Sequence, residues 1–250
     1  EIWRSVEKSV LGVLKKAKMA ASRIQSIGIT NQRETVTLFD EGKPLHRFIV
    51  WQDRRTTDFC ESRSEFEDAV RKRAGLPIDP YFSASKIRWI LTQLKISNPK
   101  KTLRFRTIDS FLFQKLTGAD VIEATNASRT SLLNLNSLVW DDDLFEIFDI
   151  PKSIAPKVIP SEGFSYKTKN VGFLPDGIPV RAALGDQQAA LFGQVGWKPG
   201  AGKMTYGTGS FVLLNVGDLP VVSKNKLVST LAIQWGSKKS LYALEGSAFI

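Results

Sequence analysis

Hydrophobic residues recur along the chain with two periods, one typical of helices and one typical of strands. Residues 2–18 carry apolar side chains at helical spacing, which predicts an amphipathic helix. Over 23–30 isoleucines alternate with polar residues, and 35–39 and 47–51 are also apolar, so each predicts a strand. Because turn residues separate the last two, we expect the three strands to form an antiparallel meander.

The middle of the chain is predominantly helical. The pattern predicts a helix over 54–74, a second helix capped by Ser83 and a third capped by Asp109. A short strand is expected over 103–108, and a further helix over 141–148. Glycines follow two of these segments, which is typical of helix ends.

The last part of the chain is richer in strands. Residues 152–177 contain many Pro, Gly, Lys and Ser residues, which predicts a long surface loop. An apolar strand is expected over 178–185, followed at once by a helix over 187–195, and 203–250 predicts three short strands. Strands mixed with helices indicate an α/β domain with a mixed sheet flanked by helices.

Composition narrows the class of protein. The 250 residues are 42% hydrophobic and 24% charged, as in ordinary globular proteins. One cysteine, Cys60, and one histidine, His46, exclude an intrachain disulfide and a Cys/His zinc site, and a lone thiol suits the cytoplasm. The net charge of +10 is scattered and no nucleic-acid motif accompanies it, so we expect no nucleic-acid partner. No apolar stretch reaches the ~18 residues of a membrane helix, so we expect no membrane insertion.

Asp186 is the most informative single position. It follows an apolar strand directly and precedes a helix, in the run Gly185-Asp186-Gln187-Gln188. Ligands of α/β proteins bind outside the carboxyl ends of strands, so Asp186 is a candidate catalytic residue. An ordinary helix N-cap explains the position equally well, since Asp is favoured there.

Three further groups of residues are candidates for a binding site. Gly207-Thr208-Gly209 could approach a phosphate, although it is also a common hairpin turn, and no Walker motif is present. Arg33 and Glu34 follow the first strand and could bind polyol hydroxyls together, provided that the strand has already turned there; a surface ion pair is the alternative. Trp51 and Tyr81 could pack on the carbons of a polyol or simply anchor the core.

In their order along the chain, these pieces resemble the glycerol kinases, within the wider family of carbohydrate kinases. The matching segments run from the first residues to the last, and the run 185–194 is the most specific. They are residues 31–35, 49–56, 81–86, 125–130, 140–142, 185–194, 205–209 and 244–247.

The resemblance implies a ribonuclease-H-like (actin-like ATPase) fold and ATP-dependent phosphorylation of glycerol to glycerol 3-phosphate, with ATP and Mg²⁺ as cofactors. It implies that the glycerol hydroxyls are bound by Arg33, Glu34, Tyr81, Asp186 and Gln187. Trp51 and Phe211 would pack on the glycerol carbons, Asp186 would be the general base, and Gly207, Thr208 and Gly209 would approach the ATP phosphates. No residue of the chain is predicted to bind the metal.

Three departures from the glycerol kinase pattern shape the remaining expectations. An Asp-x-Gly-Thr-Thr hairpin upstream and a nucleotide-binding domain downstream are absent, so we expect residues 1–250 to be a sugar-binding N-terminal domain that is inactive alone. The full-length enzyme is expected to be a cytoplasmic homo-oligomer. The Gly-Gly-Thr-Arg loop of regulated bacterial members is also absent; residues 169–175 stand there. We therefore expect no inhibition by fructose 1,6-bisphosphate.

Two alternatives to a glycerol kinase stay open. One is a kinase for another polyol or a ketose such as xylulose on the same fold. The other is a non-catalytic sugar-binding fragment. Trp51 with Arg33 and Glu34 favours glycerol, and the intact Asp186 and Thr208 favour an enzyme.

Overall fold

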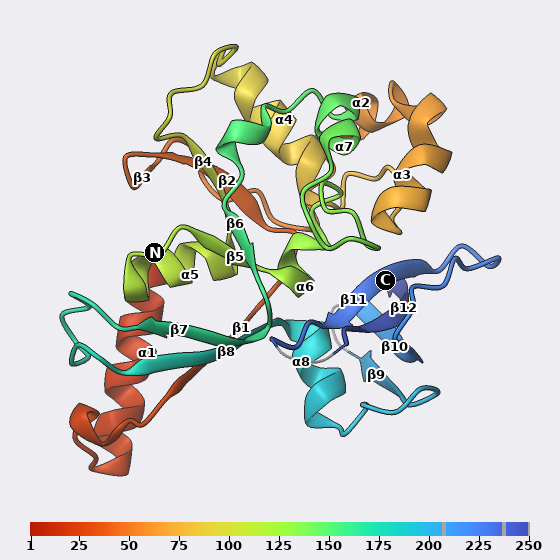
Figure 1. Ribbon diagram of the computed structural model, residues 1–250. Coiled ribbons are helices and arrows are strands. Elements are labelled where there is room, and N and C mark those ends of the chain that lie inside the picture. Colours follow the sequence, from red (N-terminus) through yellow and green to blue (C-terminus); the bar gives the residue numbers. More distant parts are fainter. Residues whose placement is uncertain (207–208, 237–238, 250) are drawn as a thin grey trace.

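The computed structural model describes residues 1–206, 209–236 and 239–249. Within these ranges the strands fall into four small sheets (Figure 1). The first sheet has the order β1-β8-β7. Strand β1 (Ile27–Asn31) runs parallel to β8 (Pro179–Gly185), and β7 (Glu162–Lys167) pairs antiparallel with β8. This mixed sheet, flanked by helices, confirms the predicted α/β class.

Two other small sheets lie in the first part of the chain. Strand β2 (Val36–Asp40) pairs antiparallel with both β3 (Lys43–Pro44) and β4 (Arg104–Thr107). Strand β5 (Val121–Glu123) runs parallel to β6 (Lys157–Ile159). In Figure 1, β5 and β6 lie between the upper part of the molecule and the β1-β8-β7 sheet.

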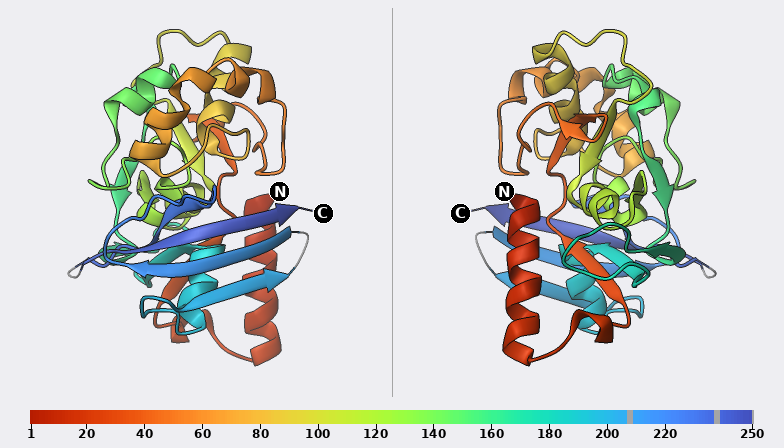
Figure 2. Two further views of the ribbon diagram at one scale, coloured as in Figure 1. Left: turned by 90° about the vertical axis from the view of Figure 1, so that its right-hand side faces the viewer. Right: turned by 90° about the vertical axis from the view of Figure 1, so that its left-hand side faces the viewer.

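The fourth sheet is built from the last strands of the chain and is antiparallel throughout. Its order is β11-β12-β10-β9, with β9 (Gly202–Tyr206), β10 (Gly209–Gly217), β11 (Val228–Ile233) and β12 (Leu241–Phe249). Figure 2 shows this sheet as a layer of its own, in blue. Helix α8 (Asp186–Gly193) contacts β1, β8 and β10 and so joins this sheet to the first one.

The helices cover the sheets from several sides (Figures 1 and 2). The longest is α1 (Ile2–Ala17), which Figure 1 shows beside the β1-β8-β7 sheet. The other helices are α2 (Thr57–Glu61), α3 (Glu67–Ala74), α4 (Ser83–Gln93), α5 (Ile108–Thr117), α6 (Ala124–Ala127) and α7 (Asp142–Ile147), with short 3₁₀ turns at Ala21–Arg23, Ser64–Phe66 and Lys152–Ile154. Gly75 and Gly118 end α3 and α5 in the left-handed conformation, as glycine allows without steric cost.

Among the described residues, four clusters of buried apolar side chains hold these elements together, and two of them are much larger than the others. The larger of these two joins β2 and β4 to α3, α4 and α7, and includes the fully buried Leu38, Ile87 and Phe105. The smaller of the two packs α5 against the first sheet through Phe113 and Val180.

The predicted antiparallel meander is wrong. Strand β1 pairs in parallel with β8 from far along the chain, whereas β2 lies in another sheet. Residues 47–51 contribute only an isolated bridge, in which Ile49 and Val36 exchange backbone hydrogen bonds. Local sequence predicted the first two strands but not their partners, because pairing is decided by which buried faces meet.

Other expectations need correction as well. The region 152–177 is not a long loop, since it contains β6 and β7; Gly163, with φ at 82°, lies where the pairing of β7 with β8 shifts register. The stretch 203–250 holds four strands rather than three. Neither Ser83 nor Asp109 caps a helix: Ser83 donates a hydrogen bond to the backbone oxygen of Glu34, and Asp109 is buried.

Candidate functional site

The parallel pairing of β1 with β8 brings two predicted site residues together. Asn31, the last residue of β1, stands in register with Gly185, the last residue of β8. Arg33 and Asp186 therefore emerge from adjacent strand ends at one edge of the sheet. The Arg33 Nε lies 3.4 Å from the Asp186 Oδ1. This is the position where α/β proteins place their ligands.

A turn after β1 lets Arg33 and Glu34 face the same side. Glu34 adopts a left-handed backbone conformation with φ at 62°, which is unfavourable for a residue with a side chain. The Thr35 amide donates to the Arg33 carbonyl oxygen at 2.7 Å, so the chain reverses sharply here. β1 ends at Asn31 and the chain reverses at Glu34, so the two side chains no longer alternate across a strand, as the shared-site hypothesis requires.

Glycine at 185 allows the Arg33 side chain to pass. A Cβ added to Gly185 would lie 2.7 Å from the Arg33 Cδ and 2.9 Å from the Gln188 Oε1. Real Cβ atoms do not approach other atoms so closely. Gly185 is therefore part of the motif and is also required so that the Arg33 side chain can pack against the end of β8.

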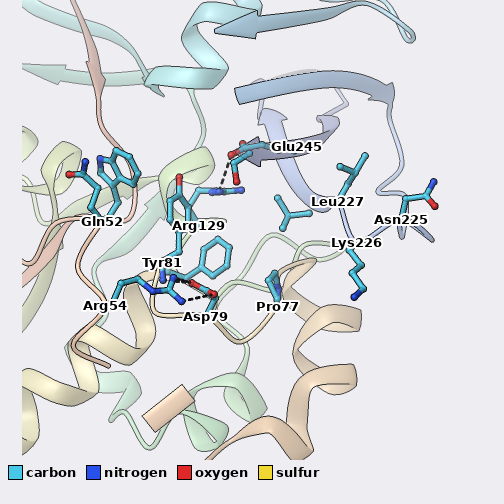
Figure 3. A pocket seen from close by; sticks show the side chains of 15 residues that line it. Gln52, Arg54, Pro77, Asp79, Tyr81, Arg129, Asn225, Lys226, Leu227 and Glu245 are labelled. Atoms are coloured by element: carbon cyan, nitrogen blue, oxygen red, sulfur yellow. Dashed lines mark hydrogen bonds and ion pairs between the residues drawn. The ribbon is translucent and has the colours of Figure 1, made fainter. Parts of the chain in front are cut away.

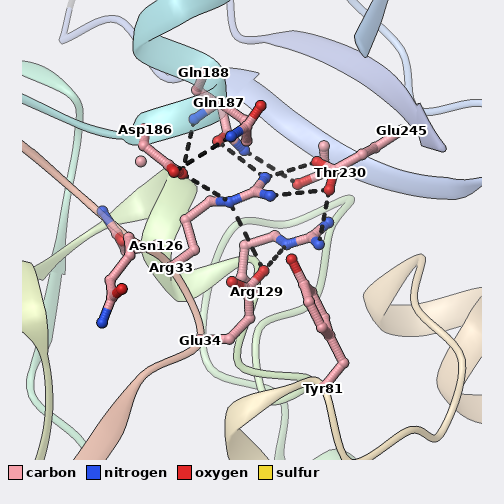
Figure 4. A network of polar contacts seen from close by, with 12 residues as sticks. Arg33, Glu34, Tyr81, Asn126, Arg129, Asp186, Gln187, Gln188, Thr230 and Glu245 are labelled. Atoms are coloured by element: carbon pink, nitrogen blue, oxygen red, sulfur yellow. Dashed lines mark hydrogen bonds and ion pairs between the residues drawn. The ribbon is translucent and has the colours of Figure 1, made fainter. Parts of the chain in front are cut away.

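Two arginines and two glutamates are buried together beneath the site (Figure 4). Arg33 donates to Glu245 through both terminal nitrogens, at 2.6 and 2.9 Å. Arg129 donates to Glu34 through Nε at 2.6 Å and to Glu245 through Nη2 at 3.2 Å. The four charges balance, and all four side chains are at most 2% exposed.

The two carboxyl groups of this cluster respond differently to their surroundings. Burial favours a raised pKa for Glu245, but Arg129 and Arg33 outweigh it and lower the pKa of that group to about 2. Burial raises the pKa of Glu34, with Arg33 and Arg129 opposing the change. Glu245 is therefore the fixed anion that orients the Arg33 guanidinium. The Arg33 Nε is buried without a hydrogen-bond acceptor, beside Asp186.

A small cavity of about 40 Å³ lies over this network. Trp51 packs edge-on against Tyr81 and Phe211, with ring centroids 5.8 and 6.1 Å apart. All seven substrate-binding residues expected from the resemblance line the cavity. The lining residues are Gln32, Arg33, Glu34, Trp51, Tyr81, Asp186, Gln187 and Phe211.

The floor of the cavity is polar and its Asp186 side chain remains accessible. That side chain is 44% exposed, whereas Gln187 and Lys203 are buried. The Lys203 amine donates to the Gln187 Oε1 and, at 2.7 Å, to the Thr205 hydroxyl. This leaves the Gln187 amide nitrogen beside Asp186, to which it donates at 3.3 Å.

A larger pocket of about 840 Å³ adjoins the small cavity and shares Trp51 and Tyr81 with it (Figure 3). Arg54 and Asp79 form an ion pair on one side of this pocket, with 2.7 Å between Nη1 and Oδ1. Leu227 lies on the other side, on the turn before β11. Trp51 and Tyr81 therefore border both the small cavity and the larger pocket.

The structure describes only part of the predicted phosphate-binding segment, which is Gly207, Thr208 and Gly209. Gly207 and Thr208 lie outside the described residues, and Gly209 begins β10. Among the described residues, no three His, Cys, Asp or Glu side chains gather in a way that could hold a metal ion. None of the described helices is long and apolar enough to cross a membrane.

Sequence reasoning missed four residues that build the site. Glu245, Arg129, Gln188 and Lys203 all contact Arg33, Glu34 or Gln187 directly. A signal was present for Glu245, since it is a lone carboxylate inside the apolar strand β12. Arg129 gave no such signal, because it follows a short polar helix where an exposed arginine would be unremarkable.

Comparison with known proteins shows the family of this chain. The pattern of the FGGY family of carbohydrate kinases, N-terminal domain, matches residues 1–193. The chain belongs to the FGGY family of carbohydrate kinases. The match ends with α8, so the β11-β12-β10-β9 sheet lies beyond it.

Individual members of the FGGY family are also similar over the whole chain. A glycerol kinase of Bdellovibrio bacteriovorus is 47% identical over 100% of the chain and 52% of its own length. A solved glycerol kinase of Plasmodium falciparum with ADP is 36% identical, with a TM-score of 0.86 over 97% of this chain and 50% of that one. A xylulose kinase of Lactobacillus acidophilus shares the fold, with a TM-score of 0.84 over 98% of this chain and 50% of that one, at 20% identity. The chain spans about half the length of the curated relatives it matches.

Proposed function

We propose that this chain provides the acceptor site of an ATP-dependent glycerol kinase, in which Asp186 is the general base. The observation that carries the proposal is the small cavity, which is lined both by Arg33, Glu34 and Asp186 and by the rings of Trp51 and Phe211. Since the relatives are about twice as long, we propose that the nucleotide is held mainly by the remainder of such a protein. The similarity to glycerol kinases at 45–48% identity supports this assignment.

The chemistry of the cavity suits a small polyol such as glycerol. Glycerol carries three hydroxyl groups, each of which both donates and accepts. Glu34 and Asp186 accept hydrogen bonds, Arg33 donates them, and the rings of Trp51 and Phe211 cover carbon-bound hydrogens.

The chain's own residues then account for the proton transfer. Arg33 Nε, which lacks an acceptor, donates to a hydroxyl oxygen placed beside Asp186. The Asp186 carboxylate takes the proton of that hydroxyl as its oxygen bonds to the γ-phosphorus of ATP, while the bond from that phosphorus to the β–γ bridging oxygen breaks and ADP leaves. Such a base is typically worth ~10²–10⁴-fold in rate. Orientation of the acceptor is most of what a protein supplies to phosphoryl transfer.

Magnesium belongs to the proposal only as a companion of ATP. When bound, it would offset phosphate charge. The described residues offer no carboxylate cluster for it, so none of them is assigned to the metal.

A substrate comparison tests the proposal. The complete gene product is assayed for ADP release from Mg-ATP with glycerol, with xylulose and with no acceptor. We expect a kcat/KM for glycerol at least a hundredfold above that for xylulose. A preference for xylulose would favour the ketose kinase, and no acceptor-dependent ADP release with either would favour a non-catalytic sugar-binding protein.

A further inference from the structure

We propose that Glu123 is a positioning residue, whose buried carboxylate fixes the two strand ends that carry Arg33 and Asp186. This inference rests on the proposed function and deepens it. Glu123 ends β5 and is the N-cap of α6, at the back of the site. It does not line the small cavity, so it would act only through its neighbours.

The Glu123 carboxylate is fully buried and collects five hydrogen bonds. Oε1 accepts from the Thr125 amide at 2.8 Å and the Ser161 hydroxyl at 2.6 Å. Oε2 accepts from the Thr125 hydroxyl at 2.6 Å, and from the amide and side chain of Asn126 at 3.1 and 3.0 Å. All five partners donate in this arrangement, which corresponds to the ionised form of Glu123 that is present above its raised pKa.

One arm of this network reaches Asp186. The Thr125 hydroxyl, held by Glu123, accepts a hydrogen bond from the Gly185 amide at 3.0 Å. Gly185 is the residue directly before Asp186. Because the Thr125 hydroxyl proton points at Glu123, its oxygen lone pairs are directed toward Gly185, and the end of β8 is fixed.

A second arm reaches Arg33. The Asn126 side-chain nitrogen donates to Glu123, which orients the amide so that its oxygen accepts from the Asn31 side chain at 2.8 Å. Asn31 ends β1, two residues before Arg33. Glu123 therefore fixes the C-terminal end of β8 through Thr125 and the C-terminal end of β1 through Asn126.

A third contact ties the same carboxylate to the rest of β8. The Ser161 hydroxyl donates to Glu123, while the Ser161 carbonyl oxygen accepts from the Ala183 amide at 2.9 Å. A structural cap of α6 alone would need only the Thr125 and Asn126 amides. The additional bonds, to the hydroxyls of Thr125 and Ser161 and to the side chain of Asn126, lead to β8 and to Asn31 of β1. They indicate a role in positioning the site.

The test substitutes Glu123→Gln, which keeps the shape but places an NH₂ group against donors. In the complete gene product we expect kcat to fall about tenfold and KM for glycerol to rise about tenfold, with KM for ATP within twofold. Glu123→Asp, which keeps the charge, should recover part of both losses. Asp141→Asn is the matched control: Asp141 also caps a helix through buried hydrogen bonds, at α7 away from the site, and should lower only stability.

The arms through Thr125 and Asn126 are also tested separately. These two variants test the positioning role even if Glu123→Gln does not fold. Thr125→Val should lower mainly kcat, and Asn126→Ser should raise mainly KM for glycerol. Independently of activity, Glu123→Gln in the complete gene product should speed hydrogen exchange of the Gly185 amide at least tenfold, while amides of β2 stay protected. Kinetic constants within twofold of wild type in all three variants, or an unchanged Gly185 amide, would overturn the inference. Wild type that does not phosphorylate glycerol would overturn the proposed function alone, since the exchange measurement does not depend on it.

Discussion

Single residues determine how the proposed site is oriented. Arg33 is fixed by two hydrogen bonds to Glu245, and Glu34 is fixed by Arg129, so neither side chain is free to choose another rotamer. Such preorganisation avoids an ordering cost when a ligand binds. Removing one partner of a buried ion pair typically costs ~3–5 kcal/mol, so the folding of each variant has to be measured beside its kinetics.

The glycerol-facing role of Arg33 and Glu34 has a kinetic signature. Hydrogen bonds to charged groups contribute ~1.5–3 kcal/mol, so Arg33→Ala and Glu34→Gln should each raise KM for glycerol roughly 10- to 100-fold. KM for ATP should change much less, because these side chains face the acceptor cavity. Steady-state kinetics with each substrate varied in turn provides the measurement. Equal effects on both KM values would mean that the pair is structural only.

The buried carboxyl groups behind the site predict an unusual dependence of stability on pH. Burial raises the pKa of Glu123 from 4.5 to about 7 and that of Asp109 from 3.8 to about 6. The folded state then binds these protons more tightly than the unfolded state. Their contribution to stability is complete below the ordinary pKa values and is lost as pH rises through the raised ones.

Urea unfolding between pH 4.5 and 7.5 measures this effect. The free energy of unfolding should decrease with rising pH across this range, by roughly 3 kcal/mol at most from Glu123, since one pKa unit corresponds to about 1.4 kcal/mol. Glu123→Gln should flatten the slope. A stability that rises through this range, or a slope that the substitution leaves unchanged, would contradict the assignment.

At the scale of elements, the parallel pair β1-β8 brings the site together. The strand ends place Arg33 beside Asp186, and Gly185 provides the space between them. Helix α8 begins at Asp186, directly from the strand. The geometry of the site thus depends on one register, Asn31 opposite Gly185.

Gly185→Ala tests that dependence. The added methyl group would meet the Arg33 side chain at 2.7 Å, so Arg33 has to shift and its bonds to Glu245 weaken. We expect a loss of about 1–3 kcal/mol in stability, as for overpacking, and at least tenfold in kcat/KM for glycerol. Gly28→Ala in β1 is the comparison, because a Cβ there would meet nothing within 4 Å. If Gly185→Ala costs no more than Gly28→Ala in both measurements, the close approach is unimportant.

Local elements could be predicted from the sequence more reliably than their partners. Hydrophobic periodicity predicts the helix before residue 18 and the strand before Asp186. Backbone chemistry predicts that helices end at Gly75 and Gly118. The pairing of β1 with β8 could not be predicted, because no local signal tells a strand which neighbour it will have. The Pro- and Gly-rich composition of 152–177 concealed β6 and β7, since turn residues sit between short strands there.

At the scale of the whole molecule, the site joins two parts of the chain. Arg33, Glu34 and Asp186 lie within the segment that matches the FGGY N-terminal domain, whereas Phe211 and Glu245 come from the sheet beyond residue 193. Family motifs were sufficient to name seven of the eight residues that line the cavity, all except Gln32. They could not name Glu245 as the anion that holds Arg33, because that contact spans 212 positions in sequence.

The account depends most on Asp186 acting as the base that takes a proton from glycerol. The direct measurement compares Asp186→Asn with wild type in the complete gene product, by turnover in a coupled ADP assay and by calorimetric titration with glycerol. The account predicts a fall in kcat of at least 10²-fold, with glycerol affinity within about tenfold, because Asn keeps the shape but cannot take the proton. Near-normal turnover in the folded variant would contradict it.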